Sequence, residues 1–177
     1  MTLKCKDRIF LVGPMGAGKS SIGKALALVT ERPFLDVDDE IVKFSGRSIP
    51  RIFEEEGEKG FRSIETEVLK RCLSIDAIIA TGGGIVVTAE NIDLLRNNGL
   101  VIYLYADVDT QYIRTLRDNN RPMIAVDDRR QRLEDIFNIR DPLYNSVNDL
   151  KIDSGASSIH DCVEQIKMKL RELEWKL

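Results

Sequence analysis

The stretch IFLVGPMGAGKS, residues 9–20, decides the fold. Its first four residues form a short apolar run, as in a buried strand, and the other eight have the spacing G-x-x-x-x-G-K-[ST] of a phosphate-binding loop. Glycines at the first and sixth motif positions let consecutive backbone N–H groups curve around an anion. The helix that follows points the positive end of its dipole at the same anion. The sequence therefore predicts a nucleoside triphosphate site.

Lys19 and Ser20 close this motif and have separate expected roles. Lys19 is expected to reach the β- and γ-phosphates, and the Ser20 hydroxyl to ligate Mg²⁺. Residues 21–29 then have the apolar spacing of a helix packed on a sheet, so the strand–loop–helix context of the motif is present. A glycine turn that binds no ligand is the alternative interpretation.

The length and composition suit a single domain. The chain has 177 residues, 43% of them hydrophobic, which is enough for one sizeable core. Its 26 Lys and Arg residues stand against 29 Asp and Glu, so nucleic acid is not an expected partner. Without a signal segment or a long apolar run, we expect a cytoplasmic protein with no membrane contact. The widely spaced Cys5, Cys72 and Cys162 are expected to be free, mostly buried thiols.

Short apolar runs alternate with longer stretches of helical spacing along the chain. Runs without polar alternation are typical of parallel strands covered on both faces, so the pattern predicts a three-layer α/β/α sandwich around a five-stranded sheet. Ligands are expected at the carboxyl ends of the strands. Residues 118–122, rich in turn formers, are the best candidate for a mobile loop. The expected strands are residues 9–12, 33–37, 77–80, 100–105 and 150–152, and the expected helices are residues 19–30, 39–44, 59–73, 89–97, 110–117, 128–139 and 157–175.

Two carboxylates stand at the end of the second expected strand, in the sequence FLDVDD, residues 34–39. Because side chains alternate along a strand, Asp36 and Asp38 are expected to point the same way, near the mouth of the phosphate loop. One carboxylate could then serve a metal and the other an acceptor hydroxyl. Capping of the helix that begins near Ile41 is the alternative role for Asp38 or Asp39.

A run of three glycines, TGGG at residues 81–84, follows the third expected strand. Glycines at the carboxyl end of a strand let a ligand lie against bare backbone and take hydrogen bonds from N–H groups. A plain flexible turn before the helix that begins near Thr88 is the alternative.

Six segments together resemble the shikimate kinase family of the nucleoside-monophosphate-kinase-like P-loop superfamily. In order, over nearly the whole chain, they are GPMGAGKSSIG, FLDVDDEI, GEKGFRSIE, TGGG, NNRPMI and RDPLY. The resemblance implies transfer of phosphate from ATP to the 3-hydroxyl of shikimate, giving 3-phosphoshikimate and ADP, in the pathway to chorismate and aromatic amino acids. It also implies one P-loop kinase domain over residues 1–177, with strand order 2-3-1-4-5, a substrate-binding segment at about 36–65 and a mobile lid at about 114–128.

The resemblance implies roles on the nucleotide side of the site. Asp36 is expected to contact Mg²⁺ through water, which makes Asp36 and Ser20 the expected metal site. Arg121 matches a lid arginine that swings over the phosphates, and Arg114 matches an arginine near the adenine base. The expected nucleotide contacts are Gly16, Ala17, Gly18, Lys19, Ser20, Ser21, Arg114 and Arg121.

The resemblance also implies roles on the acceptor side. Asp38 is expected to bind the substrate hydroxyls and to act as base, and with Lys19 and Arg121 it completes the expected catalytic set. Arg62 and Arg140 are expected to clamp the shikimate carboxylate, because paired guanidinium groups suit a planar anion. Glu65, three residues after Arg62 on a helix, is expected to hold that guanidinium in place. The residues expected to line the substrate are Gly82, Gly83 and Gly84.

Three alternatives to this function remain. Another small-metabolite kinase, such as gluconate kinase, would share the phosphate loop, but the pair of arginines and FLDVD favour shikimate. A GTPase-like switch would normally carry N-K-x-D, and the chain has no Asn-Lys dipeptide. The third is a binding protein that has lost catalysis. The expected partners are ATP and shikimate, and the expected state is a monomer.

Overall fold

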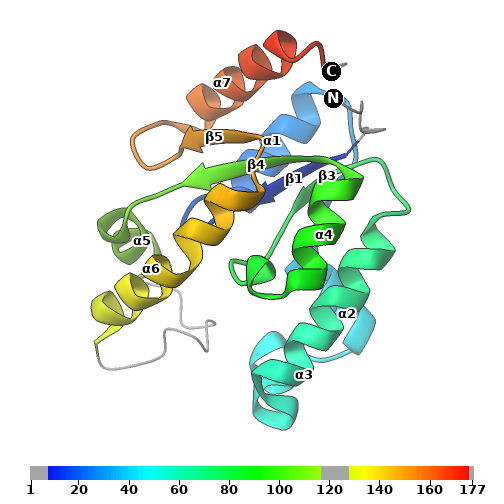
Figure 1. The fold of residues 1–177 in the computed structure, drawn as a ribbon, viewed down its shortest axis with the longest axis vertical. Coiled ribbons are helices and arrows are strands. Elements are labelled where there is room, and N and C mark those ends of the chain that lie inside the picture. Colours follow the sequence, from blue (N-terminus) through cyan, green and yellow to red (C-terminus); the bar gives the residue numbers. More distant parts are fainter. Residues whose placement is uncertain (1–7, 117–127, 176–177) are drawn as a thin grey trace.

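The computed structural model describes residues 8–116 and 128–175 of the chain (Figure 1). Its core is a five-stranded parallel sheet with the strand order β2-β3-β1-β4-β5, as predicted. In its centre, Ile9 pairs with Ile78 on one side and with Leu100 on the other. The strands are β1 (Ile9–Val12), β2 (Phe34–Asp36), β3 (Ile78–Ala80), β4 (Leu100–Tyr105) and β5 (Leu150–Asp153).

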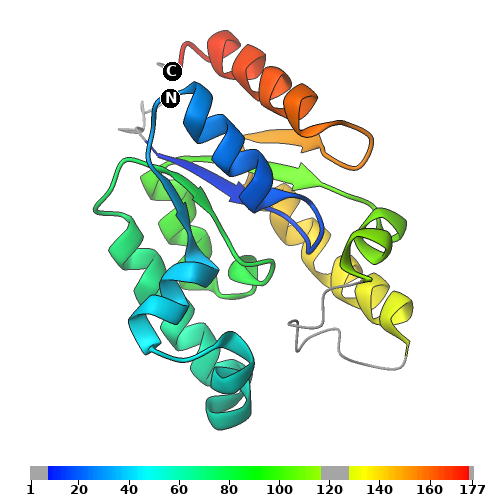
Figure 2. The same ribbon diagram turned by 180° about the vertical axis from the view of Figure 1, so that it is seen from behind.

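Helices cover both faces of this sheet, so the three-layer architecture is confirmed (Figures 1 and 2). They are α1 (Lys19–Val29), α2 (Val37–Ser45), α3 (Ile49–Cys72), α4 (Ala89–Asn98), α5 (Val108–Thr115), α6 (Arg129–Val147) and α7 (Ile159–Glu172), with a 3₁₀ turn η1 (Ile85–Val87). Side chains of β1 alternate between two buried clusters. Phe10 and Val12 pack with α2, α3, α4 and α6, whereas Ile9 and Leu11 pack with α1 and α7. No helix in the described ranges is long and apolar enough to cross a membrane.

Two helices extend beyond the predicted ranges by more than one turn. Helix α3 begins at Ile49, with Ser48 as its cap and a proline in its first turn, and this first part is not predicted. The predicted helix of residues 59–73 corresponds to the second part of α3, after the interruption at Gly57. Helix α6 continues to Val147 rather than ending near residue 139, although Pro142 lies inside it. An interior proline costs a helix about 3 kcal/mol. Burial of Tyr144 and Val147 against the sheet offsets this cost.

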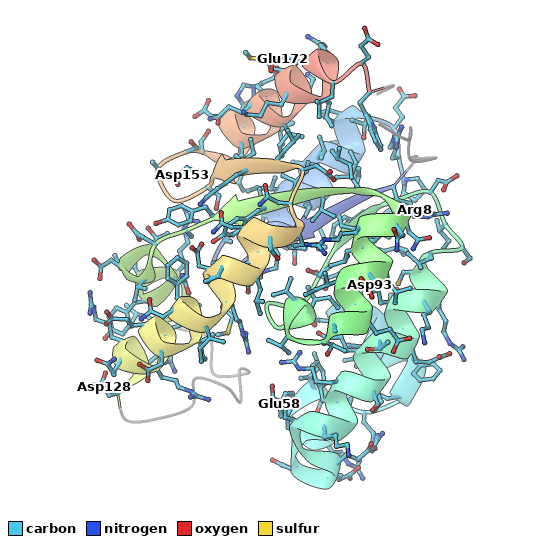
Figure 3. All side chains as sticks on the ribbon, in the orientation of Figure 1. Arg8, Glu58, Asp93, Asp128, Asp153 and Glu172 are labelled. Carbon is cyan, nitrogen blue, oxygen red and sulfur yellow. The ribbon has the colours of Figure 1, made fainter. Side chains whose placement is uncertain are left out.

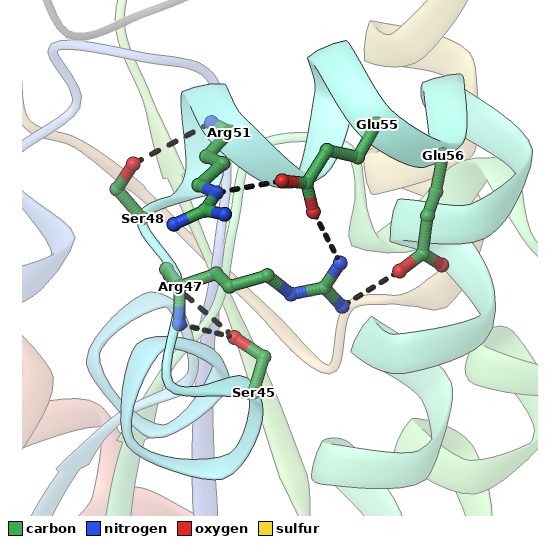
Figure 4. A network of polar contacts seen from close by, with 6 residues as sticks. All are labelled: Ser45, Arg47, Ser48, Arg51, Glu55 and Glu56. Carbon is green, nitrogen blue, oxygen red and sulfur yellow. Dashed lines mark hydrogen bonds and ion pairs between the residues drawn. The ribbon is translucent and has the colours of Figure 1, made fainter.

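The turn between α2 and α3 is tied together by charged side chains (Figure 4). Arg47 pairs with Glu55 at 2.9 Å and with Glu56 at 2.6 Å, and Arg51 pairs with Glu55 at 2.6 Å. These contacts join the turn to the first part of α3, up to Gly57. At Gly57 the φ of 68° interrupts the helical geometry, and the second part of α3 then carries side chains to the carboxyl ends of the strands.

Candidate active site

The loop between β1 and α1 presents an uncapped helix end. Gly18 occupies the N-cap of α1 with a φ of 82°, a left-handed conformation that favours glycine, and it has no side chain to cap the helix. The first amides of α1 therefore carry no side-chain cap, and the positive end of the helix dipole faces the loop. This is the arrangement that binds a phosphate.

Lys19 lies folded back along this loop. Its Nζ donates hydrogen bonds of 2.8 Å to the carbonyl oxygens of Gly13 and Pro14. Its ammonium group is thus held at the mouth of the loop, next to a pocket of about 340 Å³ that we call the loop pocket. The residues that line the loop pocket are Gly16, Gly18, Lys19, Ser20, Ser21, Asp36, Asp38, Thr81, Gly83 and Arg114.

Asp36 and Asp38 both line the loop pocket, but they arrive there differently from the prediction. Strand β2 ends at Asp36, so the argument from alternation along a strand is wrong. Asp36 is instead the N-cap of α2 and accepts a hydrogen bond of 3.0 Å from the backbone N–H of Asp38, which lies in the first turn. Capping of α2 thus falls to Asp36 rather than to Asp38 or Asp39.

Ser20 and Asp36 offer a set of oxygen donors at one edge of the loop pocket. The Ser20 hydroxyl donates a hydrogen bond of 2.5 Å to Oδ2 of Asp36. A hydroxyl and a carboxylate are ligands that Mg²⁺ accepts, with waters and phosphate oxygens completing its shell. Among the described residues no group of three or more His, Cys, Asp or Glu side chains could hold a metal by itself. The donors present at this edge, the Ser20 hydroxyl and the Asp36 carboxylate, fit a Mg²⁺ ion as two of its ligands.

Arg62 lies on α3 between two carboxylates. Its Nη1 donates to Oε2 of Glu65 at 2.8 Å, and its Nη2 donates to Oε1 of Glu58 at 3.1 Å. The Glu65 side chain is fully buried, whereas the Glu58 side chain is 49% exposed and is labelled on α3 in Figure 3. The predicted contact of Arg62 with Glu65 is confirmed. The contact with Glu58 was missed, although its spacing of four residues on a helix was a usable signal.

Glu65 is a buried acid among other charges. Burial raises its pKa, and the charge of Asp38 raises it further, whereas the guanidinium groups of Arg62 and Arg140 lower it. The net direction is upward. The charges of Asp38, Arg62 and Arg140 thus all influence the pKa of Glu65, although these residues are far apart in the sequence.

The glycine run brings these side chains against bare backbone. A Cβ atom at Gly82 would lie 2.9 Å from Oδ1 of Asp38 and 3.1 Å from Oε1 of Glu65. A Cβ atom at Gly84 would lie 2.5 Å from Cζ of Arg62, closer than real Cβ atoms approach. Only glycine leaves room for the Arg62 guanidinium at this position.

Arg140 reaches the same place from α6. The residue is 7% exposed, and its charge acts on both Glu65 and the buried Tyr144. The Tyr144 hydroxyl in turn donates a hydrogen bond to the carbonyl oxygen of Gly83. Arg62 and Arg140, far apart in the sequence, thus converge beside the glycine run.

Arg114 connects the phosphate-binding loop to the end of β5. Its Nη1 donates to the Gly16 carbonyl at 3.0 Å and its Nη2 to the Ser154 carbonyl at 2.9 Å. It lines the loop pocket and also a neighbouring pocket of about 340 Å³, which we call the side pocket. The residues that line the side pocket are Gly16, Ala17, Gly18, Ser21, Ile22, Arg114, Ser154, Ser157, Ser158 and Ile159. Arg121 and most of the predicted lid lie outside the described residues.

Comparison with known proteins identifies the family. A family model described as shikimate kinase matches residues 15–171. The chain belongs to the shikimate kinase family. A shikimate kinase of Thioalkalivibrio sulfidiphilus is 48% identical over 166 residues, which cover 93% of this chain and 87% of the relative. A structure of Acinetobacter baumannii shikimate kinase in complex with shikimate has a TM-score of 0.92 and 43% identity, covering 96% of this chain and 95% of that one.

A gluconate kinase, the alternative considered above, is similar to this chain in its fold. A gluconokinase structure from Sinorhizobium meliloti has a TM-score of 0.65 and 18% identity, and the match covers 94% of this chain and 92% of that one. At this identity the likeness concerns the fold alone. Membership of the shikimate kinase family makes the chain an ATP-dependent kinase.

Proposed function

We propose that this chain transfers the γ-phosphoryl group of ATP to the 3-hydroxyl of shikimate, giving 3-phosphoshikimate and ADP. The observation that carries the proposal is the convergence of Arg62, Arg140 and Asp38 beside the phosphate-binding loop. A small molecule with one carboxylate and several ring hydroxyls matches this set. The shikimate complex of the Acinetobacter baumannii relative supports the same substrate.

The two arginines recognise the acid. Guanidinium groups bind a carboxylate through paired, charge-assisted hydrogen bonds, and the buried surroundings of Arg62 and Arg140 strengthen such bonds. Glu65 holds the Nη1 side of Arg62, and the ligand competes with the half-exposed Glu58 for the Nη2 side. Gly82, Gly83 and Gly84 let the ring lie against backbone.

Asp38 prepares the acceptor hydroxyl. The carboxylate lines the loop pocket with Lys19 and interacts with the charge of Glu65, the partner of Arg62, so it can bind the hydroxyl that attacks phosphorus. Because the transition state of phosphoryl transfer is loose, Asp38 needs only to orient this hydroxyl and accept its proton late. Positioning supplies most of the acceleration.

Other groups stabilise the negative charge of the ATP phosphates. Lys19 and the uncapped amides of α1 bind the β- and γ-phosphates, and Ser20 and Asp36 hold the Mg²⁺ ion. When bound, Mg²⁺ neutralises part of the phosphate charge. Arg114, between the loop pocket and the side pocket, adjoins the adenosine part of the nucleotide. Arg121 is proposed to cover the phosphates on the strength of the family resemblance.

The proposal is tested by a coupled assay for ADP release. With ATP and Mg²⁺, we expect release only when shikimate is present, and loss of release when the metal is chelated. Gluconate in place of shikimate, or GTP in place of ATP, should support little release. Equal release without an acid, or faster release with gluconate, would contradict the proposal. A cytoplasmic location and a monomeric state also stay predictions.

A further inference from the structure

Tyr144 joins the acid-binding part of the site to the glycine run. It is fully buried in α6, four residues after Arg140 and thus on the same side of the helix. Its hydroxyl donates to the carbonyl oxygen of Gly83. Gly83 lies between Gly82 and Gly84, where an added Cβ atom would meet Asp38 and Arg62 respectively.

The hydroxyl of Tyr144 keeps its proton at neutral pH and can therefore donate a hydrogen bond. Burial raises its pKa, against the lowering effect of Arg140 through charge and hydrogen bonding and of Arg62 through charge. The net direction is upward from an ordinary value of 10.0, so the O–H proton stays in place. The hydroxyl can therefore donate to Gly83 and use its lone pairs toward the Arg140 guanidinium.

Gly83 also borders the phosphate-binding loop. A Cβ atom on it would lie 3.6 Å from the carbonyl oxygen of Gly13 and 3.6 Å from the backbone nitrogen of Met15, which is ordinary contact. A chain of contacts thus runs from Arg140 through Tyr144 and Gly83 to the loop that binds phosphate.

We propose that Tyr144 is a positioning residue that fixes the Arg140 guanidinium relative to the glycine run, so that the acid is bound at a set distance from the phosphate-binding loop. This inference rests on the function proposed above. Packing alone would not require the hydroxyl, because the ring of a phenylalanine would fill the same space. The proposed role therefore depends on the hydroxyl group of Tyr144 and not on its ring.

Tyr103 provides a matched control. Its ring packs on that of Tyr144, with the centroids 5.0 Å apart, and it is also fully buried. Its hydroxyl, however, donates to Oδ1 of Asp141 at 2.6 Å and not to a carbonyl oxygen of the glycine run. Tyr103→Phe thus removes a buried hydroxyl from the same layer of the core, and the acceptor of this hydroxyl, Asp141, is next to Arg140 in the sequence. The substitution leaves the hydroxyl of Tyr144 and its hydrogen bond to Gly83 in place.

The test compares Tyr144→Phe and Tyr103→Phe by steady-state kinetics and thermal unfolding, with assays well below both unfolding midpoints. We expect Tyr144→Phe to raise the KM for shikimate roughly five- to tenfold, the effect of one lost buried hydrogen bond. The KM for ATP should stay within about twofold of the wild-type value. Both substitutions should lower the unfolding temperature by a similar amount, because each removes one buried hydroxyl. Tyr103→Phe should leave both KM values unchanged.

A wild-type KM for shikimate in Tyr144→Phe would overturn the inference. An equal rise in both KM values, or the same rise in Tyr103→Phe, would also overturn it, because either result would indicate general loosening of the core. Tyr144→Phe bound to shikimate should also gain less thermal stability than wild type does. If wild-type protein released no ADP with shikimate, the proposed function would fail and the inference with it, whereas an active wild type with an unaltered variant contradicts the inference alone.

Discussion

Arg62 donates a hydrogen bond of 2.8 Å to Glu65, whose carboxylate is fully buried one turn further along α3. A buried ion pair of this kind stabilises the fold weakly, because both charges lose water, but removing one partner leaves a costly unpaired charge. The pair therefore orients the Arg62 guanidinium and adds little to the stability of the fold.

Replacement of Glu65 by Gln should change how stability depends on pH. Because burial raises the pKa of Glu65 in the folded protein, deprotonation there costs more than in the unfolded chain. The wild-type free energy of unfolding should therefore fall, relative to that of Glu65→Gln, as the pH rises above the ordinary value of 4.5 toward the raised pKa. Urea unfolding at a series of pH values measures this difference. Parallel curves for the two proteins would show that Glu65 does not titrate with a raised pKa.

Asp38→Asn should abolish most turnover and leave nucleotide binding intact. An amide can still bind the acceptor hydroxyl but cannot accept its proton, so kcat should fall by about 10²- to 10⁴-fold. Steady-state kinetics gives kcat, and calorimetry with a non-hydrolysable ATP analogue gives the affinity. Asp39→Asn, in the same turn of α2, is the control and should behave like wild type. Near-normal turnover in Asp38→Asn would remove Asp38 from the catalytic role.

Arg140→Ala should weaken binding of the acid far more than binding of ATP. Loss of a charge-assisted hydrogen bond in a buried site costs about 1.5–3 kcal/mol, so the KM for shikimate should rise roughly 10- to 100-fold. Arg130→Ala is the control on the same helix, because Arg130 pairs with Asp109 at the surface. Equal changes in the two KM values would contradict the assignment of Arg140 to the carboxylate.

Gly84→Ala should act through Arg62. The added Cβ would lie 2.5 Å from Cζ and Nη1 of Arg62, so the guanidinium has to move away from the site. We expect a higher KM for shikimate and a nearly unchanged KM for ATP. In a double-mutant cycle with Arg62→Ala, the glycine substitution should add little to the effect of removing the guanidinium. Fully additive effects would place the role of Gly84 elsewhere.

The buried cysteines should resist alkylation in the native protein. Cys72 and Cys162 are free and buried, as predicted, while Cys5 lies outside the described residues. Burial raises the pKa of the Cys72 thiol from 9.0 to about 11, so its reactive thiolate forms only at a pH well above neutral. Iodoacetamide at pH 8 followed by peptide mass spectrometry should therefore find Cys72 unmodified until urea is added. Equal modification with and without urea would show that the thiol is exposed.

The sequence predicts a structural feature well where that feature depends on residues close together in the chain. The spacing of residues 13–20 predicts the loop, its strand and its helix, because glycine and dipole requirements act within a few residues. The buried strands follow from their unbroken apolar runs. The position of Arg140 came only from the family resemblance, since an isolated arginine is most often a surface charge.

Local signals in the sequence favour the start of a helix directly after Asp36. Three acidic residues after Asp36 favour the first turn of a helix, through capping and the dipole, over continuation of the strand. The course of α6 past Pro142 could not be predicted from local propensity, because it depends on packing against the sheet. The contact of Tyr144 with Gly83 likewise joins segments that only the fold brings together.

Identification of the phosphorylated product tests the central claim most directly. Wild-type protein is incubated with ATP, Mg²⁺ and shikimate, and the product is examined by ³¹P NMR with correlation to ring protons. We predict one new phosphate monoester signal that couples to the proton at C3 of the ring, formed in equal amount with ADP. Formation of inorganic phosphate alone, or coupling to a proton at another ring position, would contradict the proposed transfer.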